Sequence, residues 1–76
     1  MKTVIIKLST IGDVKQFVNI VAKYDFDVDL ISGRYAIDAK SIMGIFSLDI
    51  SKEIKLEAHT ESPDAFFAEI KQFIVD

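Results

Sequence analysis

Apolar and polar residues alternate in four segments of the chain, which is the pattern of strands with one buried face. These segments are residues 3–8, 27–32, 34–39 and 52–60. The last segment alternates most regularly, with Ile54, Leu56 and Ala58 on its apolar side. The dipeptide Ser32-Gly33 joins the second and third segments, so we expect these two strands to form a hairpin with a tight turn.

Two other segments show the spacing of apolar side chains that is typical of one helix face. In the first these are Val14, Phe17, Val18, Val21 and Ala22, and in the second Phe66, Phe67, Ile70, Phe73 and Ile74. Asp13 lies at the start of the first helix, where a negative charge suits the helix dipole. Ser62 and Pro63 predict the N-cap and first residue of the second helix, which we expect to reach the C-terminus.

The densest apolar stretch, residues 40–48, predicts a short helix capped by Ser41. Its apolar side chains are distributed all round the helix: Ile42, Met43, Ile45, Phe46 and Leu48. A small domain cannot bury all of them, and an exposed apolar cluster usually marks an interaction site. We expect Ile45 and Leu48 in the core and a contact surface on the other side.

The predicted order of elements is strand, helix, strand, strand, short helix, strand, helix. Two long helices must bury their apolar stripes against a sheet. We therefore predict a single α+β domain over residues 1–76, an open-faced sandwich. It has a four-stranded antiparallel sheet with two long helices and one short helix on one face. The opposite, solvated face would carry Asp27, Asp29, Asp38, Glu53, Lys55, Glu57 and His59.

The amino-acid composition excludes several kinds of site and argues against several classes of function. The 76 residues include no cysteine, which excludes disulfides and thiolate metal sites, and one histidine, which excludes sites that need two imidazoles. The net charge of −3 and the lack of a basic stripe argue against nucleic-acid binding. The apolar run at residues 4–6 is too short for a membrane span. We expect a cytoplasmic protein without a metal or cofactor.

Acidic residues alternate at Asp25, Asp27 and Asp29, a spacing that could indicate a cation site. The glycine and the distal glutamate of a calcium-binding EF-hand loop are absent, so we interpret this segment as a solvated strand edge. His59 is likewise interpreted as a solvated strand residue.

Residues 40–48 read Lys-Ser-Ile-Met-Gly-Ile-Phe-Ser-Leu. This sequence closely resembles the Lys-Ser-Ile-Met-Gly-(Val/Leu)-Met-Ser-Leu motif of the HPr family, the small phosphocarrier proteins of the bacterial sugar phosphotransferase system. The order of elements resembles that family over nearly the full length, and residues 22–24, Ala-Lys-Tyr, are similar to its small-Lys-Phe sequence. The resemblance implies an HPr-like sandwich and a protein that is not an enzyme.

HPr proteins carry phosphate on a histidine in a Gly-x-His-x-Arg-Pro segment before the first helix. The corresponding loop here contains Thr10, Ile11, Gly12 and Asp13, with no histidine, arginine or proline. Asp13 also puts a negative charge where a phosphate would bind the helix start. The resemblance therefore implies a divergent member with a degenerate active-site loop.

Ser41 matches a serine of the family that a dedicated kinase phosphorylates in some bacteria; the alternative is an ordinary N-cap. Ile42, Met43 and Phe46 match the family's exposed patch for partner proteins; the alternative is core packing. The implied partners are phosphotransferase-system components or a transcriptional regulator.

Three functions follow as hypotheses. The first is an HPr-like regulatory or protein-binding module that cannot carry phosphate on histidine. The second is a functional phosphocarrier in sugar transport that uses another acceptor. The third is a structural or oligomerising domain that uses the patch of Met43 and Phe46. The chain could also be one domain of a longer protein.

Overall fold

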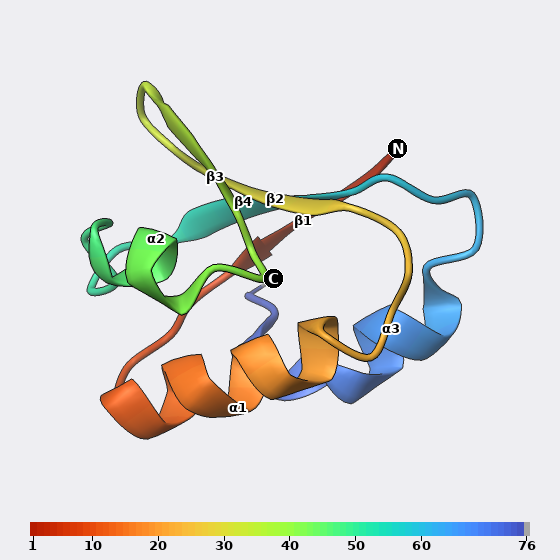
Figure 1. Cartoon of the computed structure of the whole chain (residues 1–76), viewed down its shortest axis with the longest axis horizontal. Helices are drawn as coiled ribbons and strands as arrows, with labels where there is room; N and C mark the ends of the chain where they lie inside the picture. Colours follow the sequence, from red (N-terminus) through yellow and green to blue (C-terminus); the bar gives the residue numbers. More distant parts are fainter. Residues whose placement is uncertain (76) are drawn as a thin grey trace.

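Four antiparallel strands form one sheet, and the helices cover one of its faces (Figure 1). The computed structural model describes residues 1–75. Its elements are β1 (Lys2–Ile6), α1 (Ile11–Val21), β2 (Val28–Ser32), β3 (Tyr35–Asp38), α2 (Ile42–Phe46), β4 (Ile54–Ala58), α3 (Asp64–Glu69) and the 3-10 turn η1 (Lys71–Phe73). This order and the open-faced α+β architecture confirm the predicted fold.

The strands lie in the order β1-β4-β2-β3, and every neighbouring pair is antiparallel. The register places Val4, Leu56, Leu30 and Ile37 side by side across the sheet, on the face that the helices cover. Because β4 inserts between β1 and β2, β2 is an interior strand. Asp29 therefore lies inside the sheet and not at the strand edge expected from the sequence.

The core lies between the sheet and the helices. Its buried side chains are Ile6, Leu8, Val14, Phe17, Val21, Val28, Leu30, Ala39, Ile45, Leu48, Ile54, Leu56, Ala58, Phe66, Ile70 and Phe73. Phe17 of α1 packs edge-on against Phe73, with 6.0 Å between the ring centroids. The alternating strands and the apolar stripe of α1 were predicted correctly except at Ala22, which is the exposed C-cap of α1.

The third helix is shorter than predicted at both ends. Pro63 is its N-cap, and the Pro63 carbonyl accepts the hydrogen bond from Phe67 N at 2.8 Å. Ser62 therefore does not cap it; the Ser62 N–H instead donates to Thr60 Oγ1 at 3.1 Å. At the other end α3 stops at Glu69. The expectation of two long helices is thus correct only for α1, which has 11 residues.

The segment after α3 does not continue as a helix to the C-terminus, as the apolar spacing had suggested. After η1 the chain becomes extended, and Ile74 forms a β-bridge with Ile6. Val75 N donates to Ile5 O and Lys7 N donates to Phe73 O, both at 2.8 Å. Backbone pairing with the outer edge of β1 has replaced further helical hydrogen bonds, and it also covers that edge.

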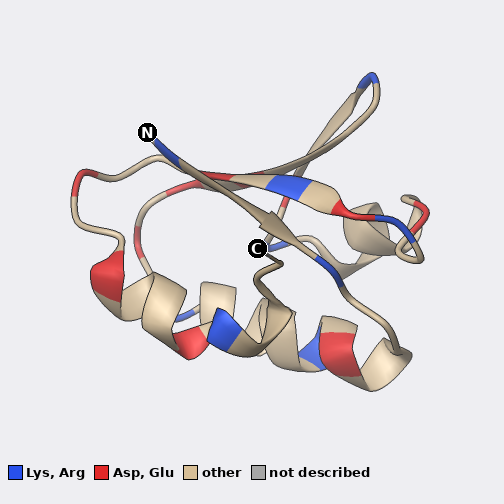
Figure 2. Cartoon of the chain, turned by 180° about the vertical axis from the view of Figure 1, so that it is seen from behind, with Lys and Arg blue, Asp and Glu red and all other residues tan. Residues whose placement is uncertain are grey.

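Basic and acidic positions are interspersed along α1 and along β4 (Figure 2), whereas α2 carries no charged residue. No helix within residues 1–75 has the length and apolar character needed to cross a bilayer.

Candidate functional site

The start of α2 is built around Ser41, the N-cap residue. Its backbone is extended, and its Oγ accepts a hydrogen bond from Gly44 N at 3.1 Å. The Ser41 carbonyl accepts the first helical bond, from Ile45 N at 3.0 Å. Before it, Asp38 fixes the approach of the chain, because Oδ1 accepts from Lys40 N at 2.8 Å and the carbonyl accepts from Ser41 N at 3.0 Å. The serine hydroxyl therefore lies at a well-defined helix start.

Gly44 explains why a glycine interrupts the apolar run. A Cβ at this position would lie 3.2 Å from Ser41 Oγ and 3.3 Å from Ile37 Cδ1. Both distances are shorter than ordinary van der Waals contact, so a side chain would push α2 away from β3 or disturb the cap. The glycine allows the close approach of α2 to the sheet.

The apolar side chains of α2 divide between the core and the surface. Ile45 and Leu48 are buried, as expected. Ile42 is half-buried and packs against the core, so it contributes less to the outer surface than expected. Met43 is 76% exposed and Phe46 is 41% exposed. These two residues make up the exposed part of the contact surface expected from the sequence, and for that expected role we call Met43 and Phe46 the docking surface.

The start of α1 is closed by its own side chains. Thr10 is the N-cap, and its Oγ1 accepts from Asp13 N at 3.0 Å. The Asp13 carboxylate in turn accepts from Ser9 N at 3.0 Å through Oδ2. The arrangement is related to a capping box, with aspartate in the place of the usual glutamate, but the carboxylate accepts from the residue before the N-cap and not from Thr10 itself. The loop residues Ile11 and Gly12 form the first turn, and Ile11 is 61% exposed.

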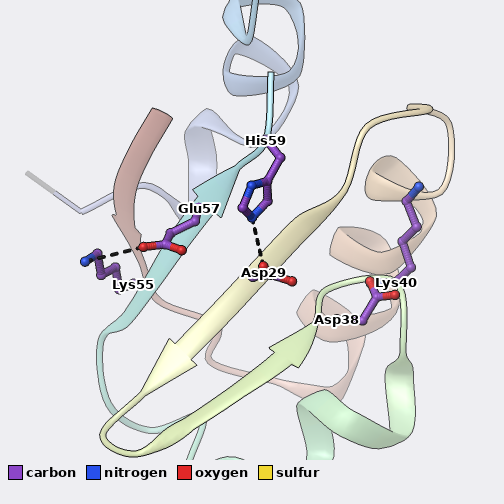
Figure 3. Close-up of polar contacts among 6 residues, drawn as sticks. All are labelled: Asp29, Asp38, Lys40, Lys55, Glu57 and His59. Carbon is purple, nitrogen blue, oxygen red and sulfur yellow. Dashed lines mark hydrogen bonds and ion pairs between the residues drawn. The ribbon is translucent and has the colours of Figure 1, made fainter. Parts of the chain in front are cut away.

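His59 is far from that loop in the fold. It follows β4 on the sheet face opposite the helices, and its Nε2 lies 2.8 Å from Asp29 Oδ2 (Figure 3). The sequence correctly predicted its face but not this contact, because the two residues are separated by 30 positions. His59 is therefore not a substitute for a histidine at the start of α1.

A polar contact that the sequence did not indicate joins the end of α1 to α3. Glu69 accepts hydrogen bonds from Lys23 and from the Tyr24 hydroxyl, the latter at 2.9 Å. The Lys23 hydrogen bond, followed by that of Tyr24, lowers the pKa of Glu69. Lys40 Nζ donates to Tyr24 O at 2.9 Å, which links this corner to the segment before α2.

The loop after α2 holds another carboxylate in place. Asp49 Oδ1 accepts hydrogen bonds from the hydroxyl and the backbone N–H of Ser51. These bonds, the hydroxyl first, lower the pKa of Asp49. Side-chain hydrogen bonds therefore hold the chain in place both before α2, at Asp38, and after it, at Asp49.

Comparison with known proteins gives two kinds of result. A family model described as "PTS HPr component phosphorylation site" matches residues 13–76. The match begins at Asp13, so Thr10, Ile11 and Gly12 lie outside it. A search of curated proteins found no match.

Solved structures agree with the family match. HPr-C-His from Thermoanaerobacter tengcongensis is 30% identical, with a TM-score of 0.81; the alignment covers 96% of this chain and 91% of that one. A phosphocarrier protein HPr from Bacillus anthracis str. Ames shares the fold at 21% identity and a TM-score of 0.77, with 95% of each chain covered. The expected resemblance is confirmed: the chain belongs to the HPr family and has its fold.

Proposed function

We propose that this chain is a regulatory or protein-binding member of the HPr family that does not carry phosphate on histidine. The observation that carries the proposal is the closed first turn of α1. There the Thr10 hydroxyl accepts from Asp13 N and the Asp13 carboxylate accepts from Ser9 N, while the only histidine of the chain, His59, lies on the opposite face of the sheet. The chain would have no catalytic role and would act in the cytoplasm without a cofactor.

The electrostatics at the start of α1 disfavour a phosphoryl group. A phosphate at a helix N-terminus is stabilised by free N–H groups and by the helix dipole. Here the Asp13 carboxylate already occupies that position, and it would repel a second anion. The Thr10 hydroxyl cannot replace an imidazole, because it forms a phosphate ester and not a readily transferred phosphoramidate.

Protein binding is assigned to the docking surface. Met43 and Phe46 leave large apolar areas in contact with water, although an ordinary core helix would turn them inward. An exposed apolar cluster of this kind usually serves a protein contact. Components of the phosphotransferase system or a transcriptional regulator are the partners that family membership supports.

Ser41 is the proposed regulatory phosphorylation site. It is exposed, its hydroxyl is next to the backbone N–H groups of the first turn of α2, and that turn contains no acidic residue. A phosphate there would gain hydrogen bonds without a carboxylate in the first turn of α2 to repel it. It would also add negative charge beside Met43, and so change which partners the docking surface accepts.

The decisive test of the missing histidine function is phosphoryl transfer. The chain is incubated with Enzyme I and labelled phosphoenolpyruvate, beside an HPr that has its histidine. We expect acid-labile label on the HPr and none on this chain. Acid-labile label on this chain would contradict the proposal and support the alternative of a functional phosphocarrier, as would rescue of sugar transport in cells that lack HPr.

The exposed docking surface also favours one other function, that of an oligomerising domain. Sedimentation of the parent chain and of Phe46→Asp separates the two. A surface for transient partners predicts the same monomer for both proteins. A permanent subunit interface predicts that the substitution dissociates the parent assembly.

A further inference from the structure

The open face of the sheet has an acidic row that runs across the strands. The register places Thr3, Glu57, Asp29 and Asp38 side by side on β1, β4, β2 and β3. Asp29 is thus directly opposite a carboxylate on each neighbouring strand. Like charges in such cross-strand positions destabilise a sheet unless positive charge is supplied.

Positive charge and a nitrogen ligand are present beside this row. Lys55 Nζ lies 3.6 Å from Glu57 Oε2, and His59 Nε2 lies 2.8 Å from Asp29 Oδ2 (Figure 3). His59 is held near the row by its backbone, because its N–H donates to Asp27 O at 2.9 Å. The imidazole and the carboxylates therefore come from backbone positions fixed by the sheet.

The ligand atoms of Asp29, Glu57 and His59 all lie within 4.8 Å of one another. Beside two of them, Asp29 and His59, the surface is hollowed by a cavity of about 390 Å³, which Asp27 and Asp38 also line. We propose that Asp29, Glu57 and His59 bind one divalent transition-metal ion of the Zn²⁺ class. This inference is independent of the proposed regulatory function, whose residues are on the helix side of the sheet.

The ligand types select this class of ion. Zn²⁺ accepts imidazole nitrogen and carboxylate oxygen together, whereas Ca²⁺ and Mg²⁺ prefer oxygen ligands alone. Bonds of about 2.1 Å in a tetrahedral site place neighbouring ligand atoms about 3.4 Å apart. For the ion to bind, the 2.8 Å between His59 Nε2 and Asp29 Oδ2 has to widen and spacings of up to 4.8 Å have to shorten, which requires side-chain rotations at this partly exposed site. The hollow beside Asp29 and His59 would leave the fourth position open to water.

Binding of the ion would disrupt only two existing contacts, Lys55–Glu57 and His59–Asp29. The Lys55–Glu57 pair is partly exposed, and such pairs contribute little to stability. The contact between His59 and Asp29 is replaced by bonds from both residues to the metal. The cation also reduces the repulsion between Asp29 and its acidic neighbours.

The site exists only when β2 and β4 are paired, because its ligands come from distant parts of the sequence. An ion that binds the folded chain but not the unfolded chain raises the temperature of unfolding. The proposed ion would therefore stabilise the sheet in addition to occupying the open face.

Titration of the untagged chain with ZnCl₂ tests the proposal, with calorimetry for stoichiometry and NMR for the imidazole. The chain has a single histidine, so its ring signals need no further assignment. We expect one ion per chain, a shift of the His59 ring signals that saturates at that ratio, and a higher unfolding temperature. Absence of binding, or binding that leaves the ring signals unchanged, would overturn the site.

Variants separate this site from general attraction of cations to an acidic protein. His59→Asn, Asp29→Asn and Glu57→Gln should each weaken Zn²⁺ binding at least about tenfold, since loss of an outer-shell partner alone has that effect. Glu53→Gln is the matched control, because it removes the same charge just before β4 and outside the three ligands. Equal losses in Glu53→Gln and Glu57→Gln would contradict the proposal. If the Asp29 variant fails to fold, the Zn²⁺ affinity of His59→Asn, which changes an exposed side chain, is compared with that of Glu53→Gln.

Discussion

The first turns of α1 and α2 have the same cap but different third residues. Thr10 Oγ1 accepts from Asp13 N at 3.0 Å, and Ser41 Oγ accepts from Gly44 N at 3.1 Å. In both helices a hydroxyl satisfies the N–H three positions later. Asp13 adds a carboxylate that reaches back to the preceding loop, whereas Gly44 adds no side chain.

The two helices also differ in which of their faces is important. α1 has 11 residues, and the closed cap begins a helix whose inner face is buried. α2 has five residues, a neutral first turn and an exposed outer face that includes Met43 and Phe46. A capping hydroxyl alone therefore does not identify a phosphorylation site. We expect the charge and the size of the residue three positions later to decide whether an anion can approach.

Phosphorylation should show the largest difference between the two caps. With ATP and the serine kinase of an HPr system, we expect labelling of the parent chain and of Thr10→Ala. Ser41→Ala should lose essentially all label, because the remaining cap at Thr10 is closed by Asp13. Mass spectrometry of the labelled peptide checks the position. Undiminished label in Ser41→Ala would remove the proposed regulatory site.

The two first-turn glycines should respond in opposite directions. A Cβ at Gly44 meets Ser41 Oγ and Ile37 Cδ1 closely, so Gly44→Val should reduce the free energy of unfolding by about 2 kcal/mol. A Cβ at Gly12 meets only Thr10 Oγ1, at an ordinary 3.6 Å. Gly12→Ala should therefore stabilise the chain by up to about 1 kcal/mol through helix propensity. Urea denaturation followed by circular dichroism measures both. A stabilised Gly44→Val would show that α2 does not need its close approach to β3.

Local sequence signals predicted the parts of the fold that local physics determines. Ser41 indicated the start of α2, and the alternation around Leu56 indicated which face of β4 is buried. The apolar spacing through Phe73 and Ile74 was misleading, because it suits a helix as well as a segment that packs on the core. The extended conformation is chosen because the free edge of β1, which is distant in the sequence, pairs with this segment.

Exposure on α2 could be predicted from the sequence, but contacts between distant side chains could not. The exposure of Met43 was expected from crowding on a short helix, and the family motif suggested the partner contact that we propose for it. The Asp29–His59 contact depends on the pairing of β2 with β4, and the Lys23–Glu69 contact depends on the packing of α1 beside α3. Neither arrangement leaves a spacing in the sequence that could be recognised.

Removal of the cap groups themselves should have smaller effects. Thr10→Ala and Asp13→Ala should each reduce the free energy of unfolding by about 1 kcal/mol, since each removes a hydrogen bond at the start of α1. The double variant should lose less than the sum, because both side chains hold the same short turn, residues 9–13. Ser41→Ala removes a single bond from a shorter helix and should lie near the lower end, about 0.5 kcal/mol. Strict additivity at Thr10 and Asp13 would argue against a closed unit.

The smallest effect is expected from the contact after the C-terminal end of α1, where Lys23 and Tyr24 bind Glu69. Among the described residues, the end of α2 has no such contact with a carboxylate. Hydrogen bonds from Lys23 and Tyr24 lower the pKa of Glu69 from its ordinary value of 4.5. A carboxyl with a lowered pKa contributes stability above its ordinary pKa and loses that contribution as the pH falls through the lowered value. Glu69→Gln should therefore be less stable than the parent at neutral pH.

In acid the parent and Glu69→Gln should converge, since the protonated Glu69 no longer carries the charge that attracts Lys23. Urea midpoints at neutral pH and well below 4.5 measure this convergence. Glu61→Gln, in the exposed segment before α3, changes the same charge without removing the partner of Lys23 or Tyr24. If both variants differ from the parent equally at both pH values, the anchor between α1 and α3 is not electrostatic.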